Sequence, residues 1–275
     1  MTKEVAKKEK AEVGPPVEFD YGKDAGLGFE NQTAADVSIP FINLLQALSP
    51  EVQEDPTTRV EGARPGMFIN SLTKELYDGR KGFLLVPVDT NHCYVEWVPR
   101  AKGGGWVGVH ELDGEAVREA RRSAKQFNKL QTKEGNDLIE TFYVYGYVLP
   151  SMESLHPGDA VVLAFTSTKI KKYREAMSAA RKSKFRPPLW ANRFLVTSFP
   201  TKNKQGQPFH NVELGFPCPA TEVLTAQEAS LLRSKVGDEP NPLIEFGRLL
   251  NEQVRSGVAR VAYESGGAEE DLPPF

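Results

Sequence analysis

Short segments rich in Val, Phe, Tyr and Leu, each bounded by turn residues, constrain the fold of this chain more than any other feature. Seven of them follow one another, at residues 67–72, 82–88, 93–98, 138–149, 160–167, 193–199 and 209–216. Two stretches with helical character, 114–130 and 168–182, interrupt the series without alternating regularly with the strands. Because a layered βαβ fold needs that alternation, the sequence predicts a mainly β protein, built as an elaborated OB-like barrel with inserted helices.

The composition divides the chain into four parts. Residues 1–36 carry charge, glycine and proline without a sustained period, which predicts a disordered N-terminal arm. Residues 37–222 contain the strand-like segments and form the expected OB-like core. Residues 223–264 have apolar residues at helical spacing, which predicts a C-terminal helical segment. Residues 265–275 lose that spacing and carry acids, so we expect a disordered acidic tail.

Several classes of function leave no trace in the sequence. The two cysteines, Cys93 and Cys218, are far apart, and the four histidines show no HxH or HExxH spacing, so we expect neither a disulfide nor a metal site. The sequence contains no P-loop motif and no GxSxG motif, which disfavours P-loop nucleotide hydrolysis and serine-hydrolase chemistry. No apolar run has membrane-spanning length, and the cysteine usage fits a reducing cytosol, so we expect a cytoplasmic protein. The missing motifs predict a protein without a cofactor and without enzymatic activity.

The charge is distributed most unevenly in residues 166–193, where nine basic residues accompany one acid, Glu175. This segment is strongly positive, although the whole chain has a formal net charge of -3. Apolar residues recur within it at spacings of three and four, at Ile170, Tyr173, Met177 and Ala180. These residues share one face of a helix, so the basic residues cover the other faces. Such a cationic surface favours a polyphosphate partner, because neutralised phosphates release their condensed counterions.

Tryptophans accompany these cations, as the binding of single strands requires. Trp190 lies inside the basic segment, and Trp106 follows a glycine-rich loop that begins with Arg100 and Lys102. The cations neutralise phosphates, while a flat ring stacks on an unpaired base and contributes about 1–3 kcal/mol. The residues expected to contact single-stranded DNA are Arg100, Lys102, Trp106, Lys169, Lys171, Lys172, Arg174, Arg181, Lys182, Lys184, Arg186, Trp190 and Arg193.

A second basic cluster lies in and after the first helical stretch. Its members are Arg118, Arg121, Arg122, Lys125, Lys129 and Lys133. Glu115 and Glu119 dilute its charge, so the sequence leaves open whether the cluster extends the cationic track or is a solvated helix face of mixed sign.

The last seven residues form the most specific motif in the chain: Glu269, Glu270, Asp271, Leu272, Pro273, Pro274 and Phe275. An acidic run that ends in Pro-Phe resembles the C-terminal tip of bacterial and phage single-stranded-DNA-binding proteins. The resemblance implies that the Phe275 ring and carboxylate dock on replication or recombination partners, while the acids steer the approach. Two internal segments, 39–46 and 165–171, are similar to segments of uncharacterised early proteins of tailed phages.

The sequence therefore favours a protein that coats single-stranded DNA in phage replication or recombination and recruits partners through its tail. A strand-annealing recombination protein is an alternative, because it needs similar basic surfaces but assembles into rings. A metal-dependent nuclease is a further alternative, with Asp89, Glu96 and Lys102 as the candidate constellation. A phage structural or host-interaction protein would bind no nucleic acid at low salt. The oligomeric state is open.

The tail predicts opposite effects on two kinds of binding. An anionic tail competes with phosphate for the cationic surface, so deletion of residues 265–275 is expected to strengthen DNA binding modestly, most visibly at low salt. The same deletion is expected to abolish partner recruitment. Phe275→Ala keeps every acid and is expected to lose partners without a gain in DNA affinity. Titrations of both variants with single-stranded DNA and with a partner protein test this; weaker DNA binding together with intact recruitment contradicts it.

Overall fold

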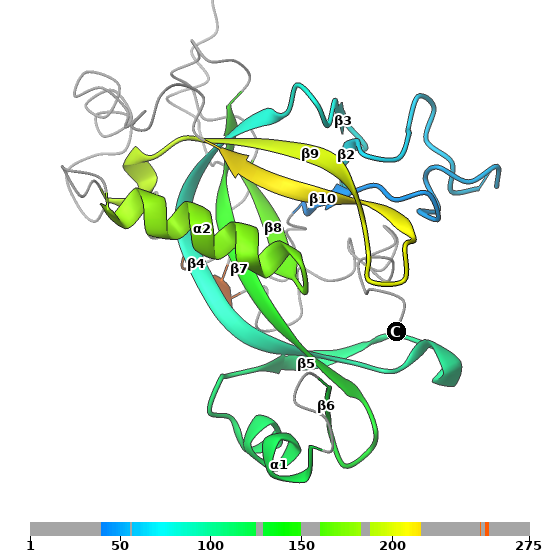
Figure 1. The fold of residues 1–275 in the computed structure, drawn as a ribbon, viewed down its shortest axis with the longest axis vertical. Helices are drawn as coiled ribbons and strands as arrows, with labels where there is room; N and C mark the ends of the chain where they lie inside the picture. Colours follow the sequence, from blue (N-terminus) through cyan, green and yellow to red (C-terminus); the bar gives the residue numbers. More distant parts are fainter. Residues whose placement is uncertain are drawn as a thin grey trace, which may run out of the picture. The chain divides into compact units, whose positions relative to one another are not determined.

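The computed structural model describes residues 40–55, 57–124, 129–149, 160–182 and 188–215, together with 248, 251 and 252 (Figure 1). Its strands are β1 (Ile42–Leu44), β2 (Phe68–Asn70), β3 (Leu76–Tyr77), β4 (Phe83–Trp97), β5 (Trp106–His110), β6 (Leu130–Gln131), β7 (Asp137–Leu149), β8 (Ala160–Thr166), β9 (Phe194–Lys202) and β10 (Pro208–Gly215). Its helices are α1 (Glu115–Ser123) and α2 (Lys169–Lys182), with short 3-10 turns η2 (Arg100–Lys102) and η3 (Leu189–Ala191).

Strand β4 is a single strand of 15 residues, which corrects the prediction of two strands at 82–88 and 93–98. It pairs with β7 in an antiparallel ladder from Leu84 to Trp97. Its polar residues 89–92 have the composition of a turn, but they are half-buried and continue the pairing. The ladder accommodates one extra residue, Val88, in a bulge between Pro87 and Asp89. Strands β5, β6 and β3 were not expected from the sequence.

The β4–β7 ladder is the centre of a seven-stranded sheet with the order β10-β9-β4-β7-β6. Strand β5 pairs with the edge of β4 that faces away from β7, and β8 pairs with β7. Side chains alternate between the two faces of the ladder. On β7, Phe142 and Val144 belong to the main core beneath α2, whereas Tyr143 and Tyr145 belong to a second core on the other face. The prediction of a mainly β protein with inserted helices is confirmed.

The OB-like barrel is not confirmed, because the strands in the described part of the chain form no closed ladder. Strands β1, β2 and β3 make a separate three-stranded sheet. The chain segment that contains β1 nevertheless contacts two strands of the large sheet, β8 and β10. Phe41 forms a parallel bridge with Val162 of β8, and the Gln46 side-chain amide exchanges two hydrogen bonds with the backbone of His210 in β10. The backbone N–H and C=O groups of His210 are therefore hydrogen-bonded to a side chain and not to a neighbouring strand at this edge of β10.

The helix predicted at 114–130 is shorter than expected. Helix α1 ends at Ser123, and Ala124 has an extended backbone. The second helical prediction, 168–182, is confirmed by α2. The N-terminal arm and the acidic tail lie outside the described residues, as does all of the 223–264 segment except three helical residues. One of these, Asn251, accepts a hydrogen bond from the Tyr145 hydroxyl at 3.4 Å, on the second core's face.

Glu51 is a buried acid whose ionised form destabilises the fold. The residue is 3% exposed, and its Oε2 atom has no hydrogen-bond partner within the described part of the chain. Burial raises the pKa of the Glu51 carboxyl above its ordinary value, against the opposing effects of its own backbone amide and of Lys74. The protonated Glu51 carboxyl therefore favours folding, and this contribution to stability is complete at pH values below the pKa of the unfolded state. The contribution is lost as the pH rises through the pKa of the folded state.

We therefore expect Glu51→Gln to raise the thermal unfolding midpoint at pH 7–8 by a few degrees. An uncharged amide avoids the cost of burying a carboxylate, about 1–3 kcal/mol. The gain should shrink below pH 4, where the wild-type carboxyl is protonated. The exposed Glu61 provides the matched control: Glu61→Gln is expected to leave the midpoint unchanged. Equal midpoints for wild type and Glu51→Gln at pH 8 would contradict the assignment.

Candidate nucleic-acid interface

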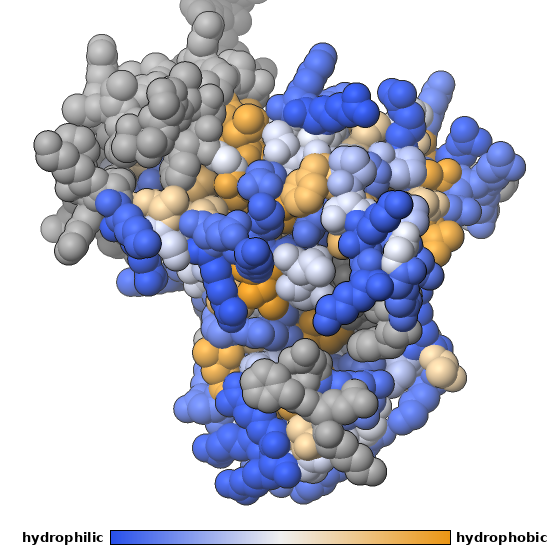
Figure 2. Space-filling view, in the orientation of Figure 1, coloured by the Kyte–Doolittle hydropathy of each residue, from blue (hydrophilic) through white to orange (hydrophobic). Residues whose placement is uncertain are grey.

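Helix α2 presents an apolar face to the sheet and a basic face to solvent. Ile170, Tyr173 and Ala180 are buried in the main core, and Met177 packs against it, as the spacing predicted. The remaining faces carry four exposed cations: Lys171, Arg174, Arg181 and Lys182. Figure 2 shows hydrophilic side chains gathered over α2 on the face that Figure 1 presents. The outer surface of this helix is therefore cationic.

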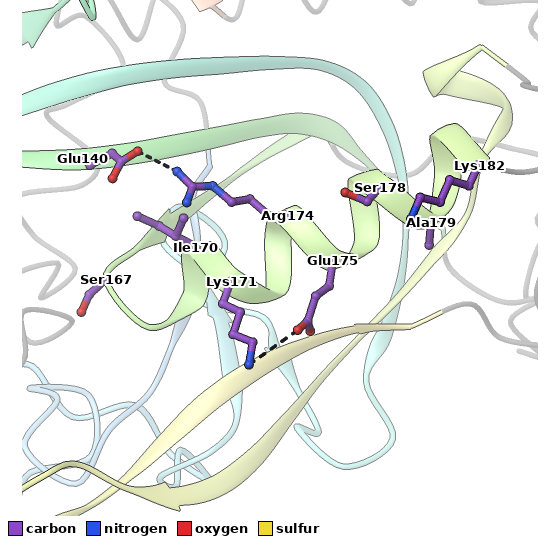
Figure 3. A pocket seen from close by; sticks show the side chains of 9 residues that line it. All are labelled: Glu140, Ser167, Ile170, Lys171, Arg174, Glu175, Ser178, Ala179 and Lys182. Carbon is purple, nitrogen blue, oxygen red and sulfur yellow. Dashed lines mark hydrogen bonds and ion pairs between the residues drawn. The ribbon is translucent and has the colours of Figure 1, made fainter.

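An open pocket lies along this outer surface (Figure 3). Its lining residues come from α2, from β7 and from the residue that follows β8: Glu140, Ser167, Ile170, Lys171, Arg174, Glu175, Ser178, Ala179 and Lys182. Two acids pair with the cations here, since Arg174 contacts Glu140 at 3.0 Å and Lys171 approaches Glu175 at 3.9 Å. Arg181 and Lys182 belong to neither pair. The pocket therefore offers ammonium and guanidinium groups beside two serine hydroxyls, which suits an anionic oxygen ligand.

Glu140 connects the helix to the sheet below it. Its Oε1 atom accepts hydrogen bonds from Arg174 and from His92 Nε2, both at 3.0 Å. The His92 ring stacks on Phe142 at 3.8 Å between centroids, and the Arg174 guanidinium lies 5.2 Å from the centroid of the same ring. A buried aromatic ring, that of Phe142, therefore lies directly beneath Arg174.

Lys172 is less exposed than Lys171 and forms an ion pair with a residue of β10. Its ammonium contacts Glu213 at 2.9 Å and Glu175 at 3.5 Å, and it lies 5.5 Å from the Phe199 ring centroid. The hydrogen bond to Glu213 raises the pKa of Lys172 above its ordinary value, and Glu175 adds to the effect. The side chain is 24% exposed, against 81% for Lys171. Lys172 therefore anchors α2 to β10 and is less accessible to a phosphate.

Two other predicted contacts point inward. Lys169 is 7% exposed and Arg193 is 6% exposed, so a ligand on the surface would not reach either side chain without a rearrangement. Lys184 and Arg186 lie outside the described residues, as do the seven predicted partner-binding residues of the tail. The cations that remain available on α2 are therefore the four exposed ones.

The predicted tryptophans are not brought together with these cations. Trp106 and Trp190 pack with Trp97 and Tyr147 against the second core, on the face of the ladder opposite α2. Arg100 and Lys102 are exposed in the turn between β4 and β5, where the Lys102 ammonium donates to the carbonyl oxygen of Glu134. The predicted tryptophans and the exposed cations of α2 therefore lie on opposite faces of the ladder.

The nuclease constellation is not assembled either. Asp89 and Glu96 lie seven residues apart on β4, on the same strand but on opposite faces of the ladder. Glu96 is buried and accepts hydrogen bonds from His110 and Asn136, both at 2.7 Å. Within the described ranges, no three His, Cys, Asp or Glu side chains are grouped as a metal site requires. In the same ranges, no helix has both the length and the apolar character needed to cross a membrane.

Comparison with known proteins places the chain in a phage family. A family model described as "Pam3 phage gp34-like protein" matches residues 7–237, which is most of the chain. The chain belongs to this family. No curated protein and no solved structure matches it. This family agrees with the phage origin that the sequence suggested.

Sequence reasoning missed several residues of the gp34-like protein's basic surface. Glu140, His92 and Phe142 form the surface beneath Arg174, yet they lie on strands far from α2 in the sequence. Strand alternation could have placed Glu140 and Phe142 on one face of β7. Only the register of β4 with β7 places His92 opposite Phe142.

The two neighbouring lysines of α2 predict different effects on stability. Lys172→Met is expected to lower the free energy of unfolding by about 1 kcal/mol, because it removes two ion pairs and the interaction with the Phe199 ring. Lys171→Met is expected to have almost no effect, since its single partner is distant and solvent screens the pair. Urea unfolding at neutral pH measures both, and equal losses would contradict the distinction. A raised pKa means that the Lys172 contribution is complete at neutral pH and is lost only above the ordinary lysine range.

Proposed function

We propose that this gp34-like protein binds single-stranded DNA through the outer face of α2. The observation that carries the proposal is the set of four exposed cations on this helix, Lys171, Arg174, Arg181 and Lys182. All of them except Arg181 line one open pocket. Acids on this surface are fewer, namely Glu140 and Glu175, and each is paired with a cation. A surface helix without a polyanionic partner usually mixes its charges more evenly for solubility.

Aromatic rings beside the cations support single strands as the ligand. The rings of His92, near Arg174, and of Phe199, beside Lys172, are half-buried, whereas Phe142 is buried and in contact with both His92 and Arg174. A duplex keeps its bases stacked on one another, whereas unpaired bases can stack on rings and on guanidinium groups. The similarity of the C-terminal seven residues to the tips of single-stranded-DNA-binding proteins supports the same ligand class independently of the fold.

In this proposal the protein acts by binding alone. It covers single strands that arise during phage replication or recombination in the host cell, and its tail, with Phe275 at the tip, recruits partner proteins. Phosphate neutralisation supplies most of the affinity, so binding is expected to weaken steeply as salt increases.

Removal of the four cations tests the proposal. A variant with Lys171, Arg174, Arg181 and Lys182 replaced by Gln is expected to bind single-stranded DNA more weakly, to a similar degree for all base sequences. The slope of log affinity against log salt should also become less steep, by about 0.7 for each phosphate that the variant no longer neutralises. Fluorescence anisotropy with a labelled oligonucleotide at several salt concentrations measures both quantities.

A charge-matched variant distinguishes a binding site on α2 from a general electrostatic attraction between the protein and DNA. Arg64, Arg80, Lys81 and Lys204 are exposed cations in loops away from α2, and their replacement by Gln removes the same charge. This control is expected to bind nearly as well as the wild type. An equal loss of affinity in the two variants would refute a site on α2, and tighter binding of duplex than of single strands by the wild type would refute the ligand class.

A further inference from the structure

Helix α1 carries a second group of exposed cations. Val117 and Ala120 are buried against Tyr94 of β4 and Leu138 of β7, which fixes one face of the helix on the sheet. Arg118, Arg121 and Arg122 are exposed on the remaining faces. Of the two acids in the helix, Glu119 is paired with Lys133 at 2.8 Å. The exposed surface of α1 is therefore basic, although less strongly than that of α2.

The register of the ladder places α1 and α2 on the same face of the sheet. Tyr94 lies opposite Glu140, and His92 lies opposite Phe142. Directly opposed residues of an antiparallel pair project to the same face, as do residues two apart on one strand. Leu138, Glu140 and Phe142 of β7 therefore share one face. Since α1 packs on Leu138 and α2 packs on Phe142, both helices cover that face.

The two helices are also close along the strand. Leu138 and Phe142 are four residues apart on β7, which corresponds to a spacing of about 13 Å. Figure 1 shows α2 across the upper part of the ladder and α1 at its lower end, and Figure 2 shows hydrophilic side chains over both helices in the same view.

Two arginines, one from each helix, interact with neighbouring residues of the ladder. Arg174 of α2 pairs with Glu140, and Arg121 of α1 lies 5.4 Å from the ring centroid of Tyr94 and donates to its hydroxyl at 3.4 Å. Tyr94 and Glu140 are directly opposed in the ladder. The cations of the two helices are thus linked through one pair of neighbouring strand residues, with Tyr94 and Phe142 beneath them.

We propose that α1 and α2 form one continuous phosphate track, so that a single nucleic-acid strand contacts both helices. This inference rests on the proposed function and extends it: it defines the path of the strand and makes affinity depend on strand length. A short oligonucleotide can occupy the α2 surface alone. A longer strand passes over the Tyr94–Glu140 pair and also binds the cations of α1.

Oligonucleotides of two lengths test the path. Site sizes of about 4–16 nucleotides are usual for proteins that bind single strands through one domain, so oligonucleotides of about 4 and about 16 nucleotides are suitable probes. A variant with Arg118, Arg121 and Arg122 replaced by Gln is expected to bind the longer probe about tenfold more weakly, and its salt slope should fall by about 0.7 for each phosphate left without a cation. Its affinity for the shorter probe should be nearly unchanged.

A second variant guards against a purely structural effect, because Arg121 also contacts Tyr94. Replacement of Arg118 and Arg122 alone leaves that contact intact, and it should still weaken binding of the longer probe selectively. The matched control replaces Arg64, Arg80 and Lys204, which should affect neither probe. Thermal unfolding of each variant verifies that the fold is retained.

The outcomes distinguish the two proposals. If the α2 variant loses binding while both α1 variants bind the two probes as the wild type does, the track ends at α2; the proposed function then stands and this inference is overturned. An equal loss of affinity for both probes in the α1 variants would also overturn it, since it would show a general field. If neither the α2 nor the α1 variants affect binding, the proposed function itself fails.

Discussion

The antiparallel pairing of β4 with β7 is the interaction on which the rest of this structure depends. Its register fixes which side chains face α1 and α2 and which face the second core. Strands β5 and β9 are attached through β4, and β6 and β8 through β7. A shift of one residue would exchange the two faces of a strand, so the single bulge at Val88 has to be held in place. Gly146 helps here, because a Cβ on it would lie 2.5 Å from the Val86 carbonyl oxygen.

The basic surface over this ladder contains acids, and their placement determines what it can do. Glu213 of β10 holds Lys172 against that strand, and Glu175 of the same helix also pairs with it, so this lysine stabilises the position of the helix. Glu140 and Glu175 pair with the exposed Arg174 and Lys171, but exposed pairs of this kind contribute only about 0–1 kcal/mol. A phosphate can therefore displace such an acid at little cost. The same pairs keep the cations oriented when no ligand is bound.

The two faces of the ladder have different chemical characters. The face beneath the helices combines exposed cations with Phe142, Tyr94 and His92, whereas the opposite face gathers Trp97, Trp106 and Trp190 around the buried Tyr145. Tyr145 also donates a hydrogen bond to Asn251, so this residue meets the same face as the tryptophans. The proposed polyanion binding on one face is thus compatible with the contact of Asn251 on the other.

The sequence by itself determined the class of structure and the chemical character of α2. Strand periodicity indicated the sheet, and apolar spacing from Ile170 to Ala180 identified the buried face of the helix, because these signals are local. The sequence could not show that residues 89–92 continue a strand. Their backbone pairs with β7, a distant segment of the chain, and a bulge before residue 89 sets the register of this pairing. It could not separate the buried Lys169 and Arg193 from the exposed cations, nor the tryptophans from α2. Only the tertiary structure decided these points and brought α1 and α2 to one face, because strand register is set by contacts between residues far apart in the chain.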